Sequence, residues 1–143
     1  MKKLLSSVLY MFCFLSISWS QTVVGVWKNL DDEDGEVKSH LEVYEEDGLV
    51  YARVLKILDN ASLKICTKCK DDRKDKDIEG MVIMWDMKPE KKKTKFKGGK
   101  ILDPKNGKTY SCKIELKEPD VLKVRGYIKA PLFGRTQEWY RVK

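Results

Sequence analysis

Apolar and polar residues alternate with a period of two along most of the chain, which is the pattern of strands that bury one face. In residues 108–116 every second side chain from Tyr110 onward is apolar, and the residues between are polar. Residues 120–128 alternate in the same way, with Ile128 expected on the apolar face. Eight strand-like segments follow one another, and none has a convincing helical period: 23–29, 39–46, 49–58, 80–87, 96–102, 108–116, 120–128 and 136–142.

Turn residues separate these segments. Asp47-Gly48 is a hairpin signal, and residues 103–107 combine a proline with Asn-Gly. The one long connection is residues 59–79. Sequential strands with mostly short connections favour a single antiparallel up-and-down β-barrel, because closure removes unpaired edges; a sandwich of two sheets is the competing architecture. Residues 80–87 are apolar on both sides, so we expect another part of the chain to cover the outer side.

The start of the chain has a different character. Met1-Lys2-Lys3 is basic, residues 4–17 are an apolar run too short for a comfortable membrane span, and Ser18-Trp19-Ser20 supplies small residues at the positions a signal peptidase reads. We therefore expect residues 1–20 to be a secretory signal peptide and residues 21–143 to be one β-barrel domain, exported to the periplasm or the extracellular space. A retained membrane anchor is the alternative; after processing we expect no membrane span.

Composition narrows the function classes. The 143 residues are 36% charged, with a net charge of +7 and one histidine, which indicates one folded domain rather than a disordered or multi-pass membrane protein. Ser39 and His40 are neighbours on a strand and face opposite sides, so they do not form a catalytic pair. With no nucleophile–base arrangement visible, we expect a non-enzyme without cofactor or bound metal. The acidic turn 31–34 is interpreted as solvated rather than as a calcium loop.

Three cysteines remain once the leader is removed: Cys66, Cys69 and Cys112. An odd number in an oxidising compartment predicts one disulfide and one free thiol. In the chain-entropy model a Cys66–Cys69 bridge contributes about 2 kcal/mol, whereas a bridge from either to Cys112 closes a much longer loop and contributes about 4 kcal/mol. The longer bridge would also tie the long connection to the barrel, and we favour it. A zinc site built from these cysteines and His40 is a weaker alternative.

Two basic segments suggest contacts outside the barrel. Lys88–Lys100 holds seven lysines and is either a contact for anionic envelope components or, more simply, a solvated hairpin. Export disfavours nucleic acid as a partner. Residues 129–135 have an apolar tip between basic residues, and we expect this tip to plug one mouth of the barrel rather than to contact a ligand or a membrane.

Motifs along the domain resemble two groups of proteins. Gly25-x-Trp27 on the first strand, with Arg141 on the last, resembles the closing element of lipocalin-like barrels, in which the basic residue packs over the tryptophan. Longer blocks are similar to a secreted bacterial family of unknown function, DUF2147: residues 25–27 with 31–35, then 97–104, 106–110, 122–127 and 132–139. The resemblance implies a small secreted, lipocalin-like barrel closed by Gly25, Trp27 and Arg141, and it implies no reaction.

A barrel of this size either holds one small molecule or is filled by its own side chains. The first case predicts a non-catalytic binding module for a small apolar or amphipathic ligand, which we favour by analogy of fold. The second predicts a cell-envelope interaction protein that works through its outer face. In both cases we expect a monomer. The candidate ligand-binding residues are Trp27, Trp85, Tyr110, Phe133 and Trp139.

Overall fold

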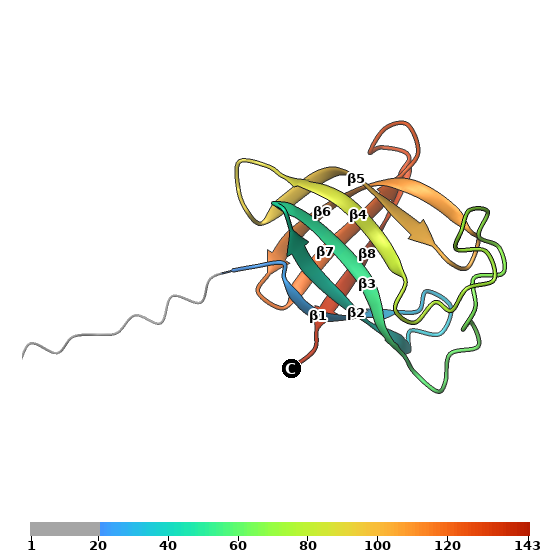
Figure 1. The fold of residues 1–143 in the computed structure, drawn as a ribbon. Helices are drawn as coiled ribbons and strands as arrows, with labels where there is room; N and C mark the ends of the chain where they lie inside the picture. The colour runs from blue at the N-terminus through green and yellow to red at the C-terminus, as the bar shows by residue number, and fades with distance from the viewer. Residues whose placement is uncertain (1–20) are drawn as a thin grey trace, which may run out of the picture.

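The computed structural model describes residues 21–143, and the expected signal peptide lies outside the described residues. Eight antiparallel strands form a closed barrel in which each strand pairs with the next and β1 pairs with β8 (Figure 1). The strands are β1 (Gly25–Leu30), β2 (Val37–Glu46), β3 (Leu49–Ile57), β4 (Val82–Pro89), β5 (Lys95–Asp103), β6 (Lys108–Glu118), β7 (Val121–Tyr127) and β8 (Gly134–Arg141). The predicted all-β, up-and-down barrel is confirmed, and the two-sheet sandwich is wrong. Within residues 21–143, no helix is long and apolar enough to cross a membrane.

The alternation along the strands places one face of each strand inside the barrel. Directly paired residues on neighbouring strands point to the same side, so the pairs trace the interior. One such row runs from Val43 through Ala52 and Met84 to Ile101 and Tyr110. Each large apolar side chain moved from water into this core contributes about 1.5–3 kcal/mol. The largest fully buried side chains are Trp27, Trp139, Met84, Met87, Leu122, Val23, Val43, Val50, Cys66 and Cys112.

The first and last strands meet at a tryptophan and an arginine. Trp27 and Arg141 are direct partners across β1 and β8, and the guanidinium carbon of Arg141 lies 4.2 Å from the centre of the Trp27 ring. Both side chains also donate hydrogen bonds to backbone carbonyls of residues 22–24, at 2.7 to 3.0 Å. A Cβ at Gly25 would meet the Arg141 guanidinium at 2.5 Å, so glycine leaves the space that this arrangement uses.

Strand β4 buries two consecutive side chains, Ile83 and Met84, which plain alternation does not allow. Register shifts interrupt the β3–β4 pairing on both sides of this segment, and Asp86 has a φ of 58°. Irregularities of this kind insert an extra residue and turn neighbouring side chains to the same side. Trp85 is left partly buried, with the guanidinium carbon of Arg73 4.8 Å from its ring centre. The expected cover over this strand therefore comes in part from the β3–β4 connection.

The β3–β4 connection, residues 58–81, contains the disulfide. Cys66 is bonded to Cys69, with their Cα atoms 5.4 Å apart. The bridge to Cys112 that we favoured is wrong, because Cys112 is a free thiol buried on the inner face of β6. The alternative of a zinc site is left without two of its ligands, because the sulfur atoms of Cys66 and Cys69 are bonded to each other. Packing ties this connection to the barrel instead: Cys66 Sγ lies 3.8 Å from the carbonyl oxygen of Pro104 in the β5–β6 turn.

Two expectations about the β7–β8 region are wrong as well. Strand β7 ends at Tyr127, so Ile128 leaves the strand and is exposed. The tip that follows does not plug the barrel, because Leu132 is 81% exposed and Phe133 is 67% exposed. Arg125 explains this placement: its guanidinium donates to the carbonyl of Pro131 at 2.7 Å and to that of Leu132 at 3.4 Å. These bonds hold the loop away from the barrel mouth.

Candidate functional site

The two ends of the barrel differ in what surrounds them. The end at which the chain enters the barrel, here called the entry end, carries residues 22–24 and the β2–β3, β4–β5 and β6–β7 hairpins, which lie to the left in Figure 1. The other end carries the β1–β2 loop, the β3–β4 connection, the β5–β6 turn and the β7–β8 loop, to the right in the same view. We call it the strap end, after residues 31–36 of the β1–β2 loop, which lie across it. Each strand runs from one end of the barrel to the other, and adjacent strands run in opposite directions. Every strand therefore has one half near each end.

The half of the interior near the entry end is filled by apolar side chains. Trp27 is completely buried and pairs with Leu41 on β2. On the opposite wall, Leu122 pairs with Leu116, and both are buried. Close packing of this kind leaves few voids larger than a water molecule. The half of the barrel near the entry end is therefore filled by the protein's own side chains.

Several inward-facing positions near the strap end are polar. Asn29 is the direct partner of Ser39 and of the buried Trp139, so all three face inward. Gln137 pairs with the buried Val124 in the same way. Asn29, Ser39 and Gln137 are nevertheless only partly buried. Solvent thus reaches these three inward-facing side chains at the strap end, and it meets hydrogen-bonding groups there.

The wall of this accessible half also has a position without a side chain. Gly126 pairs with the fully buried Cys112 and with Arg135, so the three residues share the inner face. A Cβ added at Gly126 would make ordinary contacts of 3.5 Å with Ile101 and Tyr110. The hydroxyl oxygen of Tyr110 accepts a hydrogen bond of 2.9 Å from the side-chain amide of Asn106 in the β5–β6 turn.

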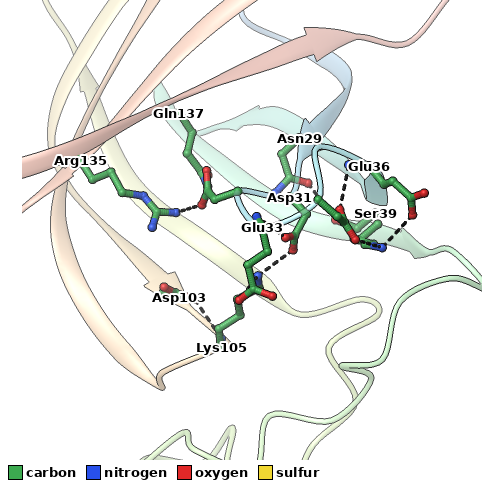
Figure 2. Close-up of polar contacts among 12 residues, drawn as sticks. Asn29, Asp31, Glu33, Glu36, Ser39, Asp103, Lys105, Arg135 and Gln137 are labelled. Atoms are coloured by element: carbon green, nitrogen blue, oxygen red, sulfur yellow. Dashed lines mark hydrogen bonds and ion pairs between the residues drawn. The ribbon is translucent and has the colours of Figure 1, made fainter.

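The β1–β2 loop lies across this end of the barrel, and we call residues 31–36 the acidic strap. Figure 2 shows its contacts with opposite walls. Asp31 accepts a hydrogen bond from the ammonium group of Lys105 in the β5–β6 turn at 2.7 Å. Asp32 is paired with the Arg135 guanidinium and accepts a bond from the Gln137 amide at 3.0 Å, both on β8. Because β1 and β5 lie opposite each other in an eight-stranded barrel, the strap spans the mouth.

Charge pairing and turn geometry hold the acidic strap in this position. The hydrogen bond from Lys105 is the main cause that lowers the pKa of Asp31 below its ordinary 3.8, and the same contact raises the pKa of Lys105. Asp31 also accepts from the backbone N–H of Glu33 at 2.8 Å. Gly35, at a φ of 71°, closes the turn by donating its N–H to the Asp31 carbonyl at 2.8 Å. Among residues 21–143, no three His, Cys, Asp or Glu side chains are grouped to hold a metal ion.

Hollows indent the surface of the barrel and its connections. One of about 420 Å³ lies beside the strap end and is lined in part by Cys69, Tyr110 and Ile128. Two more, of about 700 Å³ and 590 Å³, lie along the β3–β4 connection, the first of them next to Trp85. None of the three is lined by any of the ten largest fully buried side chains.

The five predicted ligand-binding residues do not gather in one place. Trp27 and Trp139 are buried in the barrel, and Tyr110 lies on the inner wall at the strap end. Trp85 contacts Arg73 of the β3–β4 connection, and Phe133 is exposed on the β7–β8 loop. The sequence reasoning missed Asn29, Ser39 and Gln137, because polar residues near strand ends are ordinary in sequence and only the strand pairing sets these three on the inner face.

Two buried groups in the interior are chemically distinctive. Burial raises the pKa of the Cys112 thiol to about 12, so this cysteine is not a nucleophile at neutral pH. His40 pairs with Lys28 and Lys56 on the outer face, away from Cys112. The indole N–H of Trp139 is buried and has no acceptor among the described residues. A buried donor without an acceptor costs about 1–3 kcal/mol unless water or a ligand supplies one.

These features define a class of protein: a closed, eight-stranded antiparallel barrel of lipocalin-like type. Protein HP1028 from the human pathogen Helicobacter pylori, described as belonging to the lipocalin family, has a similar structure, with a TM-score of 0.72 and 22% sequence identity over 84% of this chain and 82% of that protein. At this identity the likeness shows the fold alone. The chain belongs to DUF2147, a family described as uncharacterised proteins conserved in bacteria, whose model matches residues 25–141. No curated protein matches the chain.

Proposed function

We propose that this protein is a non-catalytic binding module that takes one small amphipathic molecule at the strap end of its barrel. The observation that carries the proposal is the division of the interior. The half near the entry end is filled, whereas inward-facing Asn29, Ser39 and Gln137 near the strap end are reached by solvent. A site with apolar walls and a few convergent polar groups is typical of small-molecule binding.

The chemistry of the accessible half indicates how such a ligand lies. The apolar part of the molecule contacts Ile101 and Tyr110 beside Gly126, where no side chain fills the wall. The polar part meets the amide and hydroxyl groups of Asn29 and Ser39, whose side chains are already 3.2 Å apart. An oxygen atom of the ligand suits the unpartnered N–H of Trp139, which neighbours Asn29 across β1 and β8. The strap's contact between Asp32 and Arg135 is exposed and opens at low cost, whereas Asp31 keeps its contact with Lys105.

A filling substitution at Gly126 tests this proposal. The barrel domain, residues 21–143, is titrated with palmitate and with an apolar fluorescent dye, following intrinsic tryptophan fluorescence. We expect saturation near one ligand per chain. Gly126→Leu places a large side chain in the accessible half and weakens binding by more than about tenfold, whereas the control Gly126→Ala, whose Cβ makes only ordinary contacts, binds like the parent. Thermal unfolding checks that both variants are folded.

Two results would overturn this function. The first is a flat titration of the parent domain with chemically varied ligands. The second is a folded Gly126→Leu variant that binds as well as Gly126→Ala, because the ligand would then lie elsewhere. Either result leaves the second candidate function, an envelope interaction protein, which the filled half of the barrel and the basic segment Lys88–Lys100 favour.

Export belongs to the same proposal. Residues 1–20 carry the basic, apolar and small-residue pattern of a secretory signal peptide, and the Cys66–Cys69 disulfide suits an oxidising compartment. We expect the domain to be found in the periplasm or outside the cell, starting at Gln21. Fractionation of bacteria expressing the full chain, with mass measurement of the mature N-terminus, tests both statements. Retention of Met1 in a cytoplasmic fraction would contradict them.

A further inference from the structure

The β7–β8 loop, residues 128–133, presents apolar side chains to solvent. Leu132 is 81% exposed, Phe133 is 67% exposed and Ile128 is 55% exposed. These are the three most exposed large apolar side chains within residues 21–143. Single exposed apolar residues are ordinary, but a group of them on one projecting loop marks a contact surface. Figure 1 shows this loop, in orange-red, projecting beyond the barrel.

Hydrogen bonds fix the conformation of this loop. The N–H of Ile128 donates to the carbonyl of Phe133 at 3.0 Å, and the N–H of Phe133 donates to the carbonyl of Ala130 at 2.9 Å. Arg125 adds bonds from its guanidinium to the Pro131 carbonyl and the Thr136 hydroxyl, each 2.7 Å long. The apolar tip is therefore held outward by the fold, and its exposure is a property of the folded barrel.

Lysines lie on and beside the tip. Lys129 lies within the loop and is exposed. The hollow of about 420 Å³ that Ile128 helps to line is also lined by Lys70, Lys108 and one carboxylate, that of Asp71. An apolar projection flanked by lysines suits the boundary between lipid headgroups and acyl chains, where apolar groups enter the bilayer and ammonium groups meet anionic headgroups.

We propose that the β7–β8 tip docks the barrel on an anionic bilayer surface, with Leu132 and Phe133 entering the interface and Lys129 facing the headgroups. The size of the tip favours a bilayer over a protein partner. A stable protein interface needs about 1,000 Å² or more of buried surface, which one short loop does not supply. A bilayer needs only the insertion of a few apolar side chains together with electrostatic attraction.

This orientation turns the β7–β8 tip to the membrane and the lysine-rich β4–β5 hairpin away from it. The tip and this hairpin lie at opposite ends of the barrel (Figure 1). Substitutions at one end therefore separate insertion of the tip from general attraction between a basic protein and an anionic surface. The docking proposal does not depend on a ligand in the barrel, so it stands or fails apart from the proposed function.

Co-sedimentation with lipid vesicles tests the docking. The barrel domain, residues 21–143, is mixed with vesicles of phosphatidylcholine alone or of phosphatidylcholine with phosphatidylglycerol. We expect binding to the anionic vesicles and at least roughly tenfold weaker partitioning of a Leu132→Ser, Phe133→Ser double variant. Two control variants keep the parent's binding to within about threefold: Leu55→Ser with Val82→Ser, which removes exposed apolar side chains from the barrel wall, and Lys91→Glu with Lys92→Glu on the β4–β5 hairpin.

Each of the other outcomes would overturn the proposal. Absence of binding by the parent domain excludes docking. Binding that is lost with the hairpin variant and kept with the tip variant assigns the contact to the basic hairpin. Dimers of the parent domain in size-exclusion chromatography that disappear with the tip variant, without any change in vesicle binding, make the tip a contact between copies of the chain.

Discussion

Replacing Trp27 by phenylalanine probes the closure of the barrel. Trp27 is completely buried, its Nε1 donates to the Val23 carbonyl at 2.9 Å, and its ring lies under Arg141. Loss of the hydrogen bond costs about 1 kcal/mol, and the space left by the smaller ring costs about 1–2 kcal/mol. The weaker attraction between phenylalanine and the guanidinium adds about 0.5 kcal/mol. We expect the variant to fold and to lose about 2–4 kcal/mol of unfolding free energy.

Urea unfolding followed by far-ultraviolet circular dichroism measures this loss. With a denaturant dependence of about 2 kcal/mol per molar, the midpoint falls by roughly 1–2 M. Trp85→Phe is the matched control, because Trp85 is only partly buried and lies on the outer side under Arg73; its loss stays below about 1 kcal/mol. Equal effects of the two substitutions would refute the idea that Trp27 and Arg141 close the barrel. In a double-mutant cycle, Arg141→Met should cost less when Trp27 is already replaced.

Three further predictions concern the cysteines and the acidic strap. Cys112, whose pKa burial raises to about 12, should resist thiol reagents at pH 8 in the folded domain and react once urea unfolds it, as mass spectrometry would show; rapid labelling without urea would contradict its burial. Replacing Cys66 and Cys69 together by serine should cost only about 2 kcal/mol, because the disulfide closes a short loop. The pKa of Asp31 is lower in the folded chain, so its contact with Lys105 stabilises above the ordinary 3.8 and is lost as the pH falls through the lowered folded value. Lys105→Met should therefore reduce the loss of thermal stability between pH 5 and pH 2, and an unchanged pH profile would contradict the contact.

Periodicity was enough to predict the architecture. Alternation such as that from Tyr110 to Leu116 predicts a strand with one buried face. Short turns such as Asp47-Gly48 predict that successive strands pair in antiparallel fashion. Eight such strands close because closure removes the unpaired edges. The same pattern failed at β4, where Ile83 and Met84 are buried together, because a bulge depends on how the partner strand is paired.

The candidate site was less readable than the fold. Aromatic residues were chosen from the sequence because they bury large surfaces, yet Trp27 fills the barrel and Phe133 leaves it. The groups that mark the accessible half, Asn29, Ser39 and Gln137, are unremarkable in sequence. They become significant only when closure of the barrel sets them on neighbouring or facing walls.

The disulfide and the acidic strap separate what local sequence determines from what tertiary structure determines. The sequence by itself specified eight strands, their order, an odd cysteine and an acidic turn, since each of these depends on residues close together in the chain. The disulfide pairing depended on which face of β6 points inward. Cys112 lies on that inner face, so Cys66 and Cys69 form the disulfide with each other. The partners of Asp31 and Asp32 are more than seventy residues away. Only the closed barrel brings them together, because opposite walls are adjacent in space and distant in sequence.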